Sequence, residues 1–211
     1  MKIFYIGLGL AALFWFVMFS PSFEITSFIH NNYFWQAMAI STVTLSLFTL
    51  IIEKNRLKQI FAFKWSYVLI GVIHATLLYL LSRFGVWIFS ELFDWAVPQI
   101  QAIYLTREQA SPMVIGLLLF FLIGPAEEFF WRGFIQDRLI KKIGVKQGTI
   151  LAIFLYSFVH IWAFNPMLLV AAFVLGLHWS ILYSKYNSIV PGLISHCLWD
   201  IAIFVVLPVN F

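Results

Sequence analysis

Apolar positions run along this 211-residue chain in long stretches rather than in the shorter amphipathic patterns of a water-soluble fold. Seven of these stretches approach the ~20 residues that a helix needs to cross the hydrocarbon core of a bilayer. We therefore predict an all-α, polytopic transmembrane bundle of about seven spans, within a range of six to eight. The stretches cover residues 3–20, 33–52, 66–89, 112–136, 148–164, 166–184 and 189–208.

Two segments need separate interpretation. The first apolar stretch follows Lys2 and resembles a signal peptide, but no clear small-x-small cleavage site comes after it, so we expect an uncleaved helix. The longer segment from Ser90 to Ser111 mixes acidic, basic and aromatic residues with Pro98. It is typical of an interfacial amphipathic stretch or a loop.

Composition supports a lipid environment. The chain is 63% hydrophobic and 10% charged, with a mean hydropathy of +0.95, whereas soluble domains carry about 25% charged residues. The formal charge of +4 comes from basic residues scattered through short loops, so we expect no nucleic-acid partner. The single cysteine, Cys197, excludes an intramolecular disulfide.

The distribution of Lys and Arg predicts the orientation. With seven alternating spans, most basic residues fall on one side, and cytoplasmic loops are normally enriched in them. We expect a cytoplasmic N-terminus, an external C-terminus and an integral location in a cell membrane. The residues on the predicted cytoplasmic side are Lys2, Lys54, Arg56, Lys58, Lys64, Arg138, Lys141, Lys142, Lys146 and Lys185.

Several ionisable residues lie inside the predicted spans, where a charge is costly and therefore suggests function. By helical rise, Glu127, His160, His196 and Asp200 lie about 13, 18, 10 and 16 Å from the cytoplasmic ends of their spans. They converge on one layer although their helices alternate in direction. The full set is His74, Glu127, Glu128, Arg132, His160, His178, His196 and Asp200.

Helical spacing assigns these residues to faces. Glu128 and Arg132 are four residues apart and can form an ion pair on one face. Glu127 is rotated by about 100° from Glu128 and lacks this partner. His196 and Asp200, also four apart, project from one face of the last span.

Each of these residues also has a purely structural interpretation. The Glu128–Arg132 pair is by itself more often structural, and a single His160 or His196 more often packs between helices. We interpret His74 and His178 as packing residues, and the abundant Trp and Phe as membrane anchors and core. Glu127, His160 and His196 at one depth are harder to explain as independent packing residues.

Three motifs in the C-terminal half resemble a known family, the CAAX-protease and bacteriocin-processing (CPBP, or Abi) intramembrane proteases, which include the Rce1-type proteases. Residues 127–132 resemble its EExxxR signature and residues 156–160 its FxxxH motif, with Tyr156 in place of Phe. Residues 196–200 match its His followed four residues later by Asn or Asp. The resemblance divides the chain into N-terminal helices, 1–111, and a protease core, 112–205.

The resemblance implies a role for each motif residue. Glu127, assisted by His160, would activate water, and His196 with Asp200 would bind or polarise the scissile carbonyl. Glu128 and Arg132 would support the site. An ionised Asp200 cannot donate a hydrogen bond as Asn does, so Asp200 either carries a proton or orients His196.

A metal remains an alternative at this point. Glu127, His160 and His196 are a possible Zn²⁺ ligand set with Asp200 behind it, although the HExxH pattern is absent. We favour a metal-free mechanism, with no cofactor.

We expect an endopeptidase that cleaves a membrane-associated peptide or protein, and the small size suggests a prokaryotic cell membrane. The alternatives are an ion-coupled transporter and a catalytically silent scaffold. Inverted repeats and broken helices would favour the transporter. The sequence does not identify the substrate, the oligomeric state or the role of residues 1–111.

Overall fold

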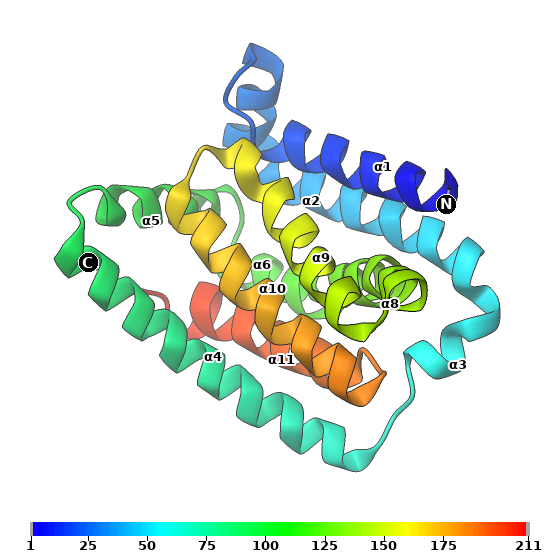
Figure 1. Ribbon diagram of the computed structural model, residues 1–211. Helices are drawn as coiled ribbons and strands as arrows, with labels where there is room; N and C mark the ends of the chain where they lie inside the picture. The colour runs from blue at the N-terminus through cyan, green and yellow to red at the C-terminus, as the bar shows by residue number, and fades with distance from the viewer. Residues whose placement is uncertain (1, 210–211) are drawn as a thin grey trace.

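The computed structural model describes residues 2–209, and within this range the chain forms helices and no strand (Figure 1). Short 3₁₀ and π-helical turns connect or interrupt several of the α-helices. The α-helices are α1 (Lys2–Phe19), α2 (Glu24–Glu53), α3 (Leu57–Ile60), α4 (Trp65–Leu92), α5 (Ala96–Leu105), α6 (Pro112–Leu118), α7 (Gly124–Phe130), α8 (Asp137–Ile143), α9 (Val145–Phe158), α10 (Pro166–Tyr186) and α11 (Val190–Ile201).

The predicted transmembrane architecture is confirmed. Within residues 2–209, six helical stretches are long and apolar enough to cross a membrane, and a shorter apolar helix forms the last of the seven predicted segments. The six are Lys2–Phe19, Glu24–Ile60, Trp65–Leu92, Pro112–Ile143, Val145–Ala163 and Pro166–Tyr186, and the shorter one is Val190–Val206.

Several helix boundaries differ from the sequence prediction, and the fourth span, for example, continues to Ile143 rather than ending near residue 136. The second helix begins at Glu24 rather than near residue 33, because the helix continues through a kink at Tyr33 (φ −136°, ψ 25°). The segment between the third and fourth spans contains a short helix, α5. Its polar and apolar mixture had suggested either a loop or an amphipathic stretch, and the second alternative fits the observed helix.

The fourth span carries the EExxxR motif on a helix with an irregular backbone. The short helix α7 lies between two π-helical turns, Leu119–Ile123 and Trp131–Gln136, and α8 continues the same rod. A π-turn inserts extra backbone into a helix and is frequent at functional sites. The rod ends at Gly144, whose φ of 85° requires a residue without a Cβ.

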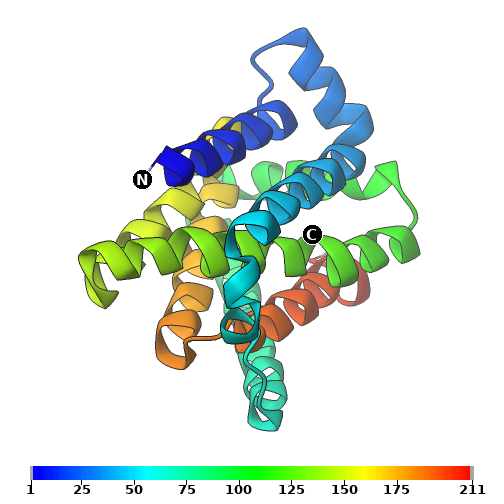
Figure 2. The ribbon, with the colours of Figure 1, turned by 90° about the vertical axis from the view of Figure 1, so that its right-hand side faces the viewer.

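The helices pack so that the two halves of the chain form one bundle. Helices α1 and α2 form an antiparallel hairpin beside the C-terminal helices, and α4 lies along α11 (Figures 1 and 2). A Cβ on Gly71 of α4 would lie 2.6 Å from Ile194 of α11, so this contact is close. The N-terminal helices therefore contact the region that bears the motifs.

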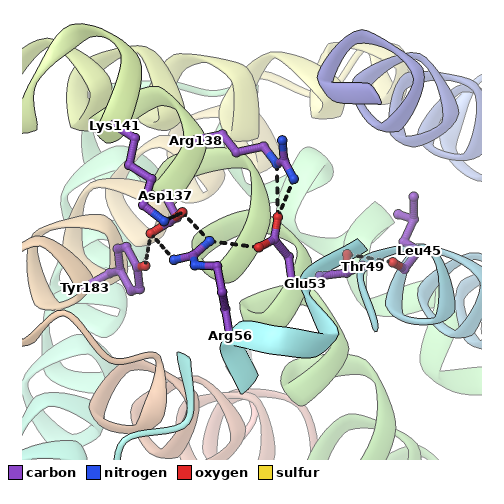
Figure 3. Close-up of polar contacts among 8 residues, drawn as sticks. All are labelled: Leu45, Thr49, Glu53, Arg56, Asp137, Arg138, Lys141 and Tyr183. Atoms are coloured by element: carbon purple, nitrogen blue, oxygen red, sulfur yellow. Dashed lines mark hydrogen bonds and ion pairs between the residues drawn. The ribbon is translucent and has the colours of Figure 1, made fainter. Parts of the chain in front are cut away.

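An ion-pair network joins α8 to the end of α2 and to α10 (Figure 3). The Arg56 guanidinium donates to both carboxylate oxygens of Asp137, at 2.7 and 2.8 Å, and to Glu53. Arg138 also binds Glu53, while Lys141 and the Tyr183 hydroxyl bind Asp137. Basic segments predicted to share one side of the membrane thus meet at one end of the bundle.

Candidate active site

Glu127 is buried, and its side chain lines an internal cavity. The hydroxyl of Tyr156, on α9, donates to Glu127 Oε2 at 3.2 Å. The additional hydroxyl that distinguishes Tyr156 from the Phe of the family motif therefore has a partner, and this partner is the candidate base. Glu127 makes no ion pair among the described residues.

Glu128 has a different environment, although it is the next residue. It is fully buried, and its Oε1 accepts a hydrogen bond from Arg132 Nη1 at 3.0 Å and lies 3.0 Å from His196 Nδ1. The predicted ion pair is present. Because a carboxylate only accepts, Nδ1 of His196 must carry a proton. Glu128 therefore connects the EExxxR motif to the last motif.

Arg132 is held by more than its carboxylate partner. Its guanidinium lies over the ring of Tyr156, 4.5 Å from the centroid, and a second nitrogen donates to the carbonyl of Gly176 at 3.4 Å. A Cβ on Gly176 would lie 2.7 Å from the Tyr156 ring, so a glycine permits this close approach. Arg132 thus fixes Tyr156 as well as Glu128.

His160 has protein partners at both ring nitrogens. Its Nδ1 lies 2.9 Å from the Tyr156 carbonyl, and the indole of Trp15 donates to its Nε2 at 3.1 Å. A carbonyl can only accept and an indole N–H can only donate. These contacts therefore fix a neutral imidazole with its proton on Nδ1. Trp15 belongs to α1, so the N-terminal helices contribute directly to this site.

His196 lies between an aromatic ring and a second carboxyl group. Its imidazole stacks on the indole of Trp179, with centroids 3.6 Å apart and planes at 17°. Its Nε2 lies 3.6 Å from Asp200 Oδ2, which is beyond hydrogen-bond distance but within ion-pair range. The i,i+4 spacing of His196 and Asp200 brings them together as predicted.

A cavity of about 570 Å³ connects these groups. Glu127, Tyr156, His160, His196 and Asp200 all line it, together with a much larger set of apolar side chains from α4, α5, α10 and α11. The apolar lining includes Leu81 and Phe89 of α4, Met167, Ala171 and Leu175 of α10, and Phe204 of the π-helical turn after α11. The motif residues from three separate segments thus surround one space that is polar at one side and apolar elsewhere.

Comparison with known families agrees with the motifs. Residues 109–202 match the family model described as Rce1-like, type II CAAX prenyl endopeptidase Rce1-like. The C-terminal region of the chain is therefore similar to the Rce1-like family. No curated protein and no solved structure shows a significant match to the chain.

The match of this region to an endopeptidase family supports a peptidase, and such a family implies a peptide or protein substrate at the membrane. The resemblance drawn from the three motifs is therefore confirmed at the level of the family. The Rce1-like region also contains all four candidate catalytic residues and both supporting ones.

The proposed zinc ligands do not form a metal site as they are arranged here. Within residues 2–209, no group of three or more His, Cys, Asp or Glu side chains is positioned to hold a metal ion. At His160 and His196, three of the four ring nitrogens are within hydrogen-bond distance of protein partners. Glu127, His160 and His196 all line the cavity.

The sequence missed two contacts of the site. We had interpreted the Trp residues as anchors and core, but Trp15 and Trp179 contact the two site histidines directly. His74 and His178, interpreted as packing residues, do pack between helices: Nδ1 of His74 lies 2.9 Å from Nε2 of His178 and links α4 to α10. Helical periodicity assigns a face to each of these residues but not the helix that it meets.

Proposed function

We propose that the protein is an intramembrane endopeptidase in which Glu127 activates the attacking water. The observation that carries this proposal is the contrast between the two adjacent glutamates. Glu128 is engaged by Arg132 and His196, whereas Glu127 faces the cavity with one neutral donor, Tyr156. A general base must reach a water beside the scissile carbonyl. Glu127 faces the cavity, and one of its carboxylate oxygens is free to accept a hydrogen bond from that water.

The proposed hydrolysis uses Glu127 for both proton transfers. Glu127 would take one proton as the water oxygen adds to the carbonyl carbon, and the negative charge would move to the carbonyl oxygen. When the tetrahedral intermediate collapses, the C–N bond breaks and the amine leaves with a proton returned by Glu127. His196, supported by Asp200 on the same cavity, would donate to the oxyanion.

His160 would orient the water through Nε2, because its Nδ1–H already donates to the Tyr156 carbonyl. Nε2 of His160 has one in-plane lone pair, and in this structure that lone pair accepts a hydrogen bond from the indole N–H of Trp15. The indole therefore has to move aside when His160 binds the water. Helix α1 is in this way part of the proposed catalytic cycle.

The lining of the cavity supports a substrate with a large apolar group beside the scissile bond. Such a group would fill the space between α4, α5, α10 and α11, while the peptide bond reaches Glu127. The family description names prenyl endopeptidases. We propose a lipid-modified or hydrophobic membrane-associated peptide as the substrate, in a prokaryotic membrane, with the N-terminus in the cytoplasm.

The test compares membranes of cells that produce the wild-type chain or the Glu127→Gln variant at equal abundance. Mass spectrometry of peptide termini should find new termini in membrane-associated proteins with the wild type that are missing with Glu127→Gln. In parallel, purified protein in nanodiscs is given two internally quenched peptides, identical except for a farnesylated cysteine. Identical termini in both membranes, or peptide cleavage that survives Glu127→Gln, would exclude this mechanism.

A further inference from the structure

The stacked pair of Trp179 and His196 is unusual among the aromatic contacts of this protein. Most aromatic pairs in the described range meet edge to face or tilted, at centroid distances near 5 to 6 Å. Trp179 and His196 instead lie nearly parallel, with centroids 3.6 Å apart. A cation placed over the face of an indole is attracted by the negative charge of the ring face. The geometry is therefore suited to a charged imidazole.

The carboxyl groups around His196 point to the same charge state. Glu128 Oε1 lies 3.0 Å from Nδ1, and Asp200 Oδ2 lies 3.6 Å from Nε2, so the ring is flanked by a carboxyl at each end. Glu127 is a third buried carboxyl nearby and shares the cavity with His196 and Asp200. Arg132 is the one other buried cation among the described residues. Buried charges are stable only when they are compensated, and a cationic His196 improves this balance.

We propose that His196 acts as an imidazolium and that Trp179 is the positioning residue that stabilises it. This inference rests on the proposed peptidase function and deepens it. The Nδ1 proton is donated to Glu128, which leaves the Nε2 proton facing the cavity, where the oxyanion of the substrate would form. Trp179 covers one face of the ring and keeps Nε2–H in this direction.

This assignment also gives Asp200 a defined role. An ionised Asp cannot donate to an oxyanion, so Asn in the family motif and Asp200 here cannot act identically. With His196 as the donor, the Asp200 carboxylate balances the imidazolium charge and limits rotation of the ring. The oxyanion is then stabilised by a charged N–H donor, and charge-assisted hydrogen bonds are the stronger ones.

The decisive experiment lowers the electron density on the face of the Trp179 indole while keeping the shape of the ring nearly unchanged. Tryptophan analogues with one to four ring fluorines are incorporated at position 179 in the full chain, and cleavage of the farnesylated quenched peptide is measured in nanodiscs. Each fluorine weakens attraction of a cation by the ring. We expect kcat to fall steadily, by about tenfold from the unmodified ring to four fluorines, with KM little changed.

The same analogues at Trp131 serve as the matched control. Trp131 is buried in the same region, but its ring contacts other aromatic rings edge to face, and its indole nitrogen has no hydrogen-bond partner among the described residues. Fluorination there should leave kcat unchanged. A flat series at position 179, or equal declines at both positions, would overturn the proposal.

Arg132 provides an internal check, because its guanidinium also lies over Trp179, 5.4 Å from the centroid. Thermal stability is therefore measured for every member of the series. If fluorination lowers thermal stability but leaves kcat unchanged, the Trp179 ring stabilises Arg132 rather than His196. That result would exclude the proposed role of Trp179 at His196.

A substrate-free measurement separates this inference from the peptidase proposal. Nitrogen-15 NMR of histidine-labelled protein in nanodiscs reports how many ring nitrogens carry a proton, and loss of signals in His196→Gln assigns them. We expect both nitrogens of His196 to be protonated at neutral pH, whether or not the peptide is cleaved. A neutral His196 would contradict the inference, and failure to cleave any peptide would instead count against the proposed function.

Discussion

Glu127 and Glu128 are adjacent in the chain but have separate partners: Tyr156 donates to Glu127, while Arg132 and His196 bind Glu128. The rotation of about 100° between successive helical residues separates them. One carboxylate is thereby held in a buried ion pair, and the other is left facing the cavity. Two neighbouring carboxyl groups in different environments are suited to different tasks.

The first prediction concerns Glu127. We expect Glu127→Gln to accumulate in membranes at the wild-type level and to be inactive, because the amide preserves size but cannot accept the proton of water. Abundance is measured by immunoblot, thermal unfolding by fluorescence, and activity by release of new peptide termini. Retained activity in this variant would favour the transporter or scaffold alternatives.

Glu128→Gln is the matched comparison and should behave differently. It removes the charge that pairs with both Arg132 and His196, and breaking a buried pair costs about 3–5 kcal/mol. We expect lower abundance and a lower melting temperature together with reduced activity. A Glu128→Gln protein as stable as the wild type would show that Arg132 has adequate alternative partners.

The second prediction concerns Tyr156. Tyr156→Phe keeps the ring beneath Arg132 and removes only the hydroxyl that binds Glu127. Since the family motif carries Phe at this position, we expect activity to remain within about tenfold of the wild type, the size of one buried hydrogen bond. Complete inactivity of a well-folded Tyr156→Phe would instead make the hydroxyl a participant in the reaction.

The third prediction concerns metal. If Glu127 works without a metal, the purified protein should contain much less than one zinc per chain and keep its activity after treatment with a strong chelator. Elemental analysis and the quenched-peptide assay measure the two quantities. Stoichiometric zinc that disappears in His160→Ala would contradict the glutamate mechanism.

The fourth prediction concerns orientation. Single cysteines placed in the segment 138–146, which the structure shows as most of α8, the turn at Gly144 and the start of α9, should react with a membrane-impermeant maleimide only after the cells are opened, in a Cys197→Ser background. A cysteine in the turn near Pro21 should react in intact cells. The opposite pattern would reverse the predicted topology and the depth comparison that depends on it.

The transmembrane class could be predicted from the sequence because it depends on local properties. An apolar run long enough to span the bilayer must pair its backbone groups internally, so it forms a helix whatever its neighbours are. The Glu128–Arg132 ion pair and the His196–Asp200 contact were likewise predictable, since both follow from the spacing of residues on one helix.

The contacts that connect these pairs needed the tertiary structure. Trp15 meets His160 across 145 residues of sequence, and His196 meets Glu128 across 68. Helical periodicity shows which face a residue occupies, but the packing of the bundle decides which face of another helix it meets. For this reason the chain alone identified the site residues as candidates, while only the fold showed that Trp15 holds His160 neutral and that Trp179 covers His196.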